Sequence, residues 1–492
     1  MMEREAMPVG TTVMPGGTRH ADGRPQMPGP PTLPGAGWYA YALPRLKDPV
    51  LTLLELQAKY GDIVSLGRNK AAPILVFGPE NNHTIMSNPD LFYCLDTSSK
   101  DSPIRMPEGS TPARLLAGVT GMNGPKHLQH RRLLMPAFHK KRVEALRDVI
   151  VARVQEHMTH WRPGMQINLA HEMLDLSLSL AISSLLGLDP TQEGKRVRYL
   201  LEQWSTRGLS PQVALLPYNV PGLPYRRFLH LSDELQTEFK RIIAKKRQFG
   251  TQSGDALSLL LDAQDEDGGT LTEDDLLGHL STLFTAGHET TASSLTWTFF
   301  LLAQHPQVMQ ALMEEMDSKL AGSAPTMEQM YGDLPVLDGV VNESLRMFPP
   351  GMWIIRTSTA PFQLGPYHLP KGTHIILSPA ATHYRAGIYR EPHRFMPERW
   401  RDIEPNTYEY MPFGGGPRRC LGATFAQAEL KLAIPMILQQ FRIEVPEGAR
   451  VDRGGTILSF PKGGLDVVLR EQDRQFETVT VRGNIHDLVN LN

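Results

Sequence analysis

The 492-residue sequence predicts a mainly α-helical protein with a small β lobe, built as one large domain. Apolar residues follow helical spacing through most of residues 124–320; Leu257, Leu260 and Leu261, for example, fall at i, i+3 and i+4. Alternation typical of strands is confined to short stretches within residues 62–78, 353–400 and 455–470. No clear linker divides residues 40–470, so we expect a single folded unit there.

The composition excludes several classes of protein. Hydrophobic residues make up 41% and charged residues 21%, which is ample for a core and argues against global disorder. A net charge of −2 removes bulk electrostatics as a reason to expect a nucleic-acid partner. The only cysteines, Cys94 and Cys420, cannot form a disulfide framework or a Cys-rich metal centre. Such sparing use of cysteine fits a reducing compartment, and we expect a cytoplasmic protein.

The two ends of the chain differ from its middle. Residues 1–36 carry seven Pro and six Gly and lack the apolar run of a secretory signal or a transmembrane anchor, which predicts a loosely packed arm. A loose GxGxxA match at residues 35–40 lacks the preceding strand that a dinucleotide site needs, because prolines come before it. The main domain is expected over residues 37–470, followed by a C-terminal extension over 471–492. Alternation in residues 476–482 suggests an added strand.

The predicted elements follow in chain order. Residues 49–60 read as an amphipathic helix, and residues 62–67 and 73–78 as a β-hairpin. The clearest helix begins after Thr272, a good N-cap followed by three acidic residues, and ends at Gln304 before His305-Pro306. Its length of roughly 48 Å is enough to cross a domain. Further helices are expected to about residue 320, over 335–347 and over 421–441, with a hairpin over 455–470.

The most informative segment is the glycine-rich turn around Cys420. A lone cysteine is more often a small buried hydrophobe than a ligand. This one leads directly into a helix, where backbone N–H groups favour the thiolate. Gly416 and Gly422 allow a flat partner to approach the backbone, Arg418 suits a carboxylate, and Phe413 can exclude water. A thiolate in such a loop suits one cofactor especially well, a haem whose iron takes Cys420 as axial ligand.

These residues match a family signature. The segment resembles F-x-x-G-x-R-x-C-x-G of the cytochrome P450 monooxygenases at all five fixed positions. Glu343 and Arg346 resemble the family's E-x-x-R, and share a helix face at i, i+3. Residues 395–400 resemble the stretch in which Arg399 would complete a buried, structural Glu343–Arg346–Arg399 network. The resemblance spans about residues 30–470 and implies a helix-rich triangular fold that holds haem b.

A second motif lies on the long helix. Residues 285–291 resemble the family's A-G-x-[DE]-T element. Ala286 and Thr290 are four apart on one face, so Ala286 leaves space beside the haem and Thr290 can donate a hydrogen bond to dioxygen. Glu289 can relay protons with water. The alternative is a threonine bonded to its own helix beside a surface glutamate. His288-Glu289 does not begin a zinc-protease H-E-x-x-H, because residue 292 is Ala.

Haem propionates require cations, and four residues are candidates for binding them. His127 and Arg131 are four apart on one predicted helix face. The family often has W-x-x-x-R there, and this chain has His127 in place of the Trp. Arg356, in the first β piece, and Arg418 are the other candidates.

The resemblance also implies a reaction. The acid–alcohol pair of the long helix favours reductive activation of O₂ and hydroxylation or epoxidation of a lipophilic small molecule, such as a fatty acid, terpenoid or polyketide. No flavin or nicotinamide fingerprint occurs, so electrons would come from a separate ferredoxin or flavodoxin with its reductase. A peroxide-driven or rearranging haem-thiolate enzyme and a non-catalytic haem sensor remain alternatives.

The resemblance also points to two surfaces. Basic residues expected on the cysteine side of the haem would dock an acidic redox protein, unless they form an ordinary solvated face: Lys126, Arg132, Lys140, Lys141, Arg142 and Arg419. An apolar substrate pocket would be lined by the loop over 104–122 and by Phe284, Ala286, Met352, Trp353, Ile354, Ile457 and Leu458. Residues 215–228 would form a lid or a patch that touches a membrane. Core packing competes with the pocket interpretation at each lining position.

Overall fold

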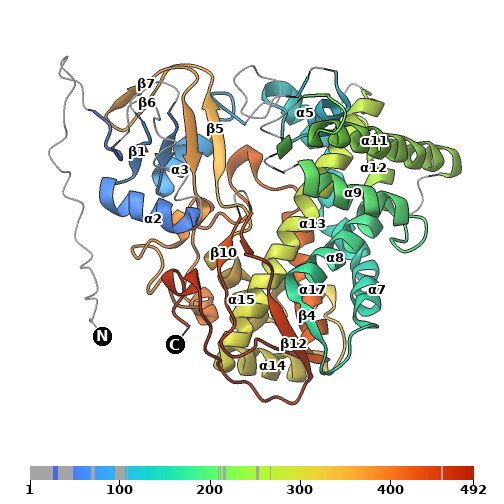
Figure 1. The fold of residues 1–492 in the computed structure, drawn as a ribbon, viewed down its shortest axis with the longest axis vertical. Helices are drawn as coiled ribbons and strands as arrows, with labels where there is room; N and C mark the ends of the chain where they lie inside the picture. Colours follow the sequence, from blue (N-terminus) through green and yellow to red (C-terminus); the bar gives the residue numbers. More distant parts are fainter. Residues whose placement is uncertain are drawn as a thin grey trace.

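The structure is a computed structural model that describes residues 26–31, 48–67, 72–94, 106–107, 109–208, 210, 212–213, 218–250, 254–265, 268–455 and 458–491. Most of the predicted N-terminal arm, and Ile457 and residues 104–105 of the predicted pocket, lie outside these ranges. Helices dominate, and the strands form small sheets, so the predicted mainly α class with a small β lobe is confirmed (Figure 1).

The helices before the centre of the chain are mostly short. They are α2 (Pro49–Tyr60), α3 (Pro79–Met86), α4 (Thr111–Leu116), α5 (Gly124–Leu134), α6 (Lys140–Ala145), α7 (Arg147–Met158), α8 (Leu169–Ala181), α9 (Lys195–Gly208), α11 (Pro224–Phe249) and α12 (Ala256–Asp262). The later ones are α13 (Glu273–Gln304), α14 (Pro306–Leu320), α15 (Pro335–Met347), α16 (Pro379–His383) and α17 (Ala423–Leu438).

The largest sheet forms the β lobe, and its strand order is β1-β2-β8-β5-β3. Its strands are β1 (Ile63–Ser65), β2 (Ile74–Val76), β3 (Phe92–Tyr93), β5 (Ile354–Ser358) and β8 (His374–Leu377). The predicted hairpin is present as the antiparallel β1–β2 pair, and β2 pairs with β8 in parallel. The hairpin β6 (Phe362–Leu364) with β7 (Tyr367–Leu369) extends the lobe.

The prediction of a single hairpin over residues 455–470 is wrong. The two-residue strands β10 (Arg453–Gly454) and β11 (Phe460–Pro461) pair with each other. The longer β12 (Asp466–Glu471) pairs instead with β9 (Phe441–Glu444) and with β4 (Gln166–Asn168). These partners lie far away in sequence, so alternation within the segment could not reveal them.

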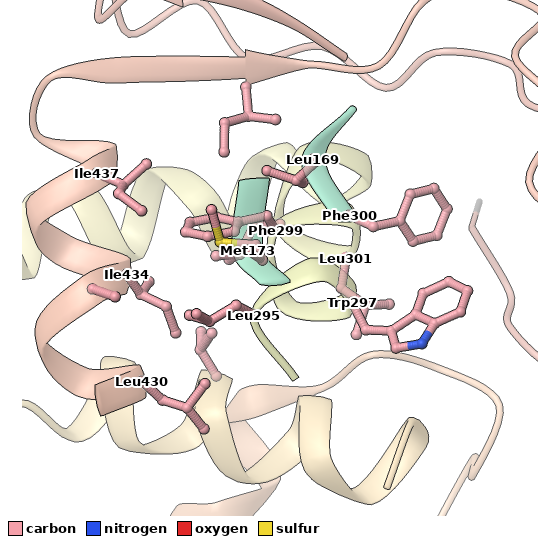
Figure 2. Close-up of a cluster of buried hydrophobic side chains, with 14 of the residues drawn as sticks. Leu169, Met173, Leu295, Trp297, Phe299, Phe300, Leu301, Leu430, Ile434 and Ile437 are labelled. Carbon is pink, nitrogen blue, oxygen red and sulfur yellow. The ribbon is translucent and has the colours of Figure 1, made fainter. Parts of the chain in front are cut away.

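The long helix α13 forms as predicted, over 32 residues. Thr272 Oγ1 accepts a hydrogen bond from Asp275 N at 3.2 Å, and Asp275 Oδ2 accepts one from Thr272 N at 3.2 Å, which makes a capping box. The helix crosses the centre of the molecule (Figure 1). Its second half is buried among α8 and α17, where Figure 2 shows fully or nearly fully buried side chains meeting: Leu169, Met173, Leu295, Trp297, Phe299, Phe300, Leu301, Leu430, Ile434 and Ile437.

The C-terminal extension packs onto this same core. Val481, Ile485 and Leu488 are buried members of the main hydrophobic cluster. Residues 476–482 do not form the expected strand, although Val451 N donates to Arg482 O at 2.7 Å.

One described segment is long and apolar enough to cross a membrane, Leu169–Leu186 in α8 and the turn after it. It is 78% buried inside the protein, which is what a core helix of a folded domain requires.

Candidate functional site

The loop before α17 is held in one conformation by its backbone. Cys420 N donates to Phe413 O at 2.8 Å, and Gly414 N donates to Met411 O at 3.0 Å. Gly416 has φ +62°, and a Cβ there would lie 2.3 Å from the carbonyl oxygen of Met86 in α3. Glycine at this position is therefore required by the turn and by α3, a reason that the sequence alone did not indicate.

Cys420 lies in the loop just before α17, with its side chain accessible. The residue is exposed, yet burial among surrounding atoms raises the pKa of its thiol. A hydrogen bond from Gly422 N–H and the charges of Arg131 and Arg419 act in the opposite direction and favour the thiolate. The predicted backbone N–H donor to the sulfur is therefore present. Its effect on the pKa of the free thiol is smaller than that of burial. A cation bound at the sulfur would reverse that balance.

Glu343 is the centre of a buried hydrogen-bond network in which both of its carboxylate oxygens have donors. Arg346 binds its carboxylate with two nitrogens at 2.9 Å each, and Arg399 Nε lies 3.0 Å from Oε1. The structure thus brings together the three predicted residues, with Glu343 and Arg346 fully buried. Two further donors were not predicted, Trp400 Nε1 at 2.9 Å and Met396 N at 3.1 Å. Every oxygen of the buried carboxylate is satisfied.

His383, which no sequence motif marked, connects this network to the cysteine loop. Its Nδ1 lies 2.9 Å from Arg346 O, and its Nε2 accepts a hydrogen bond from Met411 N at 2.8 Å. Burial, helped by the charge of Arg346, lowers the pKa of His383 to about 3. The ring is therefore neutral, with its proton on Nδ1, and fixes the first residue of the loop relative to α15.

The four candidates for binding the haem propionates, His127, Arg131, Arg356 and Arg418, lie close enough to affect one another's pKa. Burial first, and then the charges of Arg418, Arg131 and Arg356, lower the pKa of His127 to about 4. Arg418 donates to Met122 O and, at 2.8 Å, to Asn123 Oδ1, but its buried Nε has no hydrogen-bond partner.

No ion pair joins any of these three arginines to a carboxylate among the residues that the structure describes. The three guanidinium groups and the neutral imidazole of His127 thus lie together with no acidic partner in the described part of the chain. Like charges placed close together destabilise the folded chain, and binding of an anion beside them would offset that cost.

On α13, the predicted acid–alcohol pair lies beside an accessible position. Ala286 is exposed, although Phe284 and His288 on either side are buried. Thr290 Oγ1 donates to Ala286 O at 2.6 Å, so in this structure the hydroxyl is bonded to its own helix, as the alternative interpretation expected. Glu289 is not a surface residue, because its side chain is 16% exposed and burial raises its pKa. A carboxyl group with a raised pKa keeps its proton to a higher pH than an exposed one does.

A buried glutamate that the sequence did not single out faces α13 from α17. Glu429 is 2% exposed, and its Oε2 accepts a hydrogen bond from Thr291 Oγ1 at 3.0 Å. Burial raises the pKa of Glu429 to about 8, and the Thr291 hydrogen bond opposes this only in part. Glu429 lies in α17, nine residues after Cys420, and no local sequence pattern marks its position.

The predicted substrate residues separate into two groups. Phe284 is fully buried and stacks on Phe239 of α11 at 6.1 Å, and Met352 is 2% exposed in the main core, so core packing accounts for both. Ala286, Trp353, Ile354 and Leu458 keep accessible surface, while Ile457 lies outside the described residues.

The two predicted surfaces are placed as follows. The residues of the basic set are all exposed: Lys126, Arg132, Lys140, Lys141, Arg142 and Arg419. Of the expected lid, residues 215–217 lie outside the described ranges; among the rest, Tyr218 and Val220 are exposed, whereas Tyr225 and Phe228 are buried.

Comparison with known proteins decides the family. Residues 28–466 match the family model described as cytochrome P450. The chain belongs to the cytochrome P450 family. This P450 is 32% identical over 434 residues to cyclooctatin synthase of Streptomyces melanosporofaciens, covering 86% of this chain and 91% of that protein. It is 33% identical to pentalenene oxygenase of Streptomyces avermitilis, over 66% of this chain and 73% of that protein.

Solved structures agree with the fold. A retinoic acid-bound cyanobacterial CYP120A1 has a TM-score of 0.77 and 25% identity, covering 91% of this chain and 99% of that one. A cytochrome P450DA haem domain has a TM-score of 0.76 at 23% identity, covering 92% and 99%. The helix-rich P450 fold is thus confirmed. Since its relatives include proteins named as oxygenases and monooxygenases, this P450 is a monooxygenase and hence an oxidoreductase.

The residues of this chain fit the haem that the family implies. The donor set needs one thiolate for the iron and cations for two propionates. Cys420 is accessible and receives the Gly422 N–H, and the arginine cluster lacks acidic partners within the described ranges. The cluster's surplus of positive charge is what two carboxylates would neutralise.

Proposed function

We propose that this P450 uses O₂ and two electrons from a separate ferredoxin or flavodoxin system to hydroxylate or epoxidise a terpenoid. The observation that carries the proposal is the convergence of His127, Arg131, Arg356 and Arg418 near the accessible Cys420, because no acid of the described chain balances them. Relatives named for cyclooctat-9-en-7-ol and pentalenene favour a terpenoid over the fatty acids and polyketides that the sequence left open.

Haem b, when bound, supplies the oxidising chemistry, and the side chains around it supply binding and protons. Cys420 would be the iron ligand, with the Gly422 N–H at its sulfur limiting the charge on the thiolate. Arg131, Arg356 and Arg418 would bind the propionates. His127 is neutral at physiological pH, so it would contribute an N–H donor and no charge.

Glu289 and Thr290 would deliver protons to the oxygen side. The half-buried Glu289 carboxyl holds its proton more tightly than an exposed one, because burial raises its pKa. The Thr290 hydroxyl currently donates to Ala286 O, and a rotation about χ1 would direct it toward the space beside Ala286. Ala286, Trp353, Ile354 and Leu458 are the accessible residues that would contact the substrate.

Spectroscopy and turnover test the proposal together. The wild-type protein should show the red-shifted ferrous–CO absorption band of thiolate ligation, and Cys420→Ala should lose it. Terpenoids should shift the ferric spin state more than fatty acids of similar size. Product formation with a surrogate ferredoxin and reductase is expected. Full-speed turnover with peroxide, and none with the ferredoxin system, would establish the peroxide-driven alternative instead.

A further inference from the structure

Two histidines and a glutamate gather where α7 ends and α8 begins, and none of them belongs to the haem site. His157 is in the last turn of α7, His160 follows that helix, and Glu172 is in the first turn of α8. The Nε2 atoms of His157 and His160 lie 3.0 Å and 3.5 Å from the same carboxylate oxygen, Glu172 Oε2. One ligand atom from each residue can be chosen so that all three lie within 4.8 Å of one another.

The buried nitrogen of this cluster is unsatisfied. His157 is 8% exposed, and its Nε2 makes no hydrogen bond of acceptable geometry despite its 3.0 Å approach to Glu172. Its Nδ1 lies 3.8 Å from Asp175 Oδ2, a second carboxylate of α8. A buried ring nitrogen without a hydrogen bond is uncommon and calls for an explanation, such as an ion at the site.

The Glu172 carboxylate is oriented by a hydrogen bond from the buried Trp161. Trp161 Nε1 donates to Glu172 Oε2 at 2.9 Å, and the indole is 1% exposed with its ring 5.7 Å from that of Phe441. This hydrogen bond holds the Glu172 carboxylate in place, as a metal-ligating carboxylate is held by its outer partners.

We propose that His157, His160 and Glu172 form a binding site for a divalent transition metal, with Zn²⁺ the best match. Imidazole nitrogen and carboxylate oxygen are its usual ligands at about 2.0–2.2 Å, and tetrahedral geometry then separates ligand atoms by roughly 3.3 Å. The separations of 3.0 Å and 3.5 Å bracket that value. Exposed His160 can adjust by side-chain rotation, and water would complete the coordination. The ion would tie the end of α7 to the start of α8.

Zinc binding to the haem-loaded protein tests this site independently of activity. Equilibrium dialysis with Zn²⁺ alone, followed by elemental analysis, gives zinc bound per haem. The matched variants are His160→Ala, which removes an exposed ligand without disturbing the core, and Glu172→Gln. His171→Ala is the control, because His171 is an exposed histidine next to Glu172 and outside the cluster.

We expect one zinc per haem in the wild type and in His171→Ala, and an affinity more than about tenfold lower in both ligand variants, since losing an outer partner alone costs 10–100-fold. Zinc should also raise the melting temperature of the wild type but not of His160→Ala. Equal binding by all four proteins, or none in the wild type, would overturn the proposal and leave the cluster as an ordinary network of ion pairs.

Discussion

Glu343 of α15 and Glu429 of α17 are buried to the same depth, at 0% and 2% exposure, but their surroundings are opposite. Glu343 accepts hydrogen bonds from two arginines, an indole and a backbone amide. Glu429 has one hydroxyl partner, Thr291, and its pKa is raised to about 8 by burial. Burial alone therefore does not decide whether a glutamate is charged. The number of cationic and N–H donors that the fold brings to it does.

The arginines of the protein show a similar contrast between a set with an acidic partner and a set without one. Arg346 and Arg399 share the Glu343 carboxylate and donate their other hydrogen bonds to backbone carbonyls, whereas Arg131, Arg356 and Arg418 meet no acid among the described residues. The first set has its partners when the chain folds. The second would gain them from an anionic ligand, as proposed above for a haem.

The largest effect is expected from breaking the complete network. Glu343→Gln leaves two buried guanidinium groups without a counter-charge, and we expect a loss of about 3–5 kcal/mol in the free energy of unfolding. Chemical denaturation followed by circular dichroism measures it. Exposed Glu398→Gln, from the adjoining turn, is the control and should change little. A loss below about 1 kcal/mol would mean that the network is not a structural element.

The isolated glutamate should make stability depend on pH. Between pH 4.5 and about 8 the folded chain holds a proton on Glu429 that the unfolded chain releases, so stability falls as pH rises through that window. The cost is about 1.4 kcal/mol for each pH unit crossed.

Glu429→Gln should therefore flatten the stability profile and gain most over the wild type near pH 8. Denaturation at several pH values, with exposed Glu328→Gln as control, measures this. Parallel profiles for wild type and Glu429→Gln would show that the carboxyl is not protonated as the structure indicates.

A substitution among the arginines that lack an acidic partner should have the opposite consequence to Glu343→Gln: it should affect haem binding and not the stability of the haem-free chain. Arg131→Gln removes one of several like charges, so we expect no loss of stability in the haem-free chain. Haem release should become about 10–100-fold faster, which corresponds to one charge-assisted hydrogen bond of 1.5–3 kcal/mol. Haem transfer to an acceptor protein measures the rate. Arg132→Gln, on the exposed side of α5, is the matched control. An unchanged rate in Arg131→Gln would remove it from the propionate site.

At Thr290 we expect little effect on the fold and a change mainly in the coupling of electrons to product. Its hydroxyl bonds to Ala286 O within the helix, so Thr290→Ala should cost less than about 1 kcal/mol and leave haem binding unchanged. Peroxide released per electron pair consumed should rise, because proton delivery is impaired. Thr296→Ala removes a similar helix-bonded hydroxyl in the buried part of α13 and serves as control. If both variants couple equally well, Thr290 has no role in proton delivery.

The sequence by itself determined the class of fold, the position of α13, the cysteine loop and the Glu343–Arg346 pair, whereas Arg399, 56 residues from Glu343, was predicted only through the family resemblance. These rest on local signals: a cap with its acidic first turn, glycines at turns, and pairs at helical spacing. Each of these signals lies within a few residues along the chain, where backbone geometry alone relates the side chains.

Tertiary structure decided the rest. Hydrogen bonds join Trp400 to Glu343 across 57 residues, His383 to Met411 across 28 and Thr291 to Glu429 across 138. Packing of α15 against the turn over residues 397–401, of α16 against the cysteine loop and of α13 against α17 sets those contacts, and no local pattern encodes it. The protonation states of Cys420, Glu289 and Glu429 follow the same rule, because burial and neighbouring charges exist only in the folded chain.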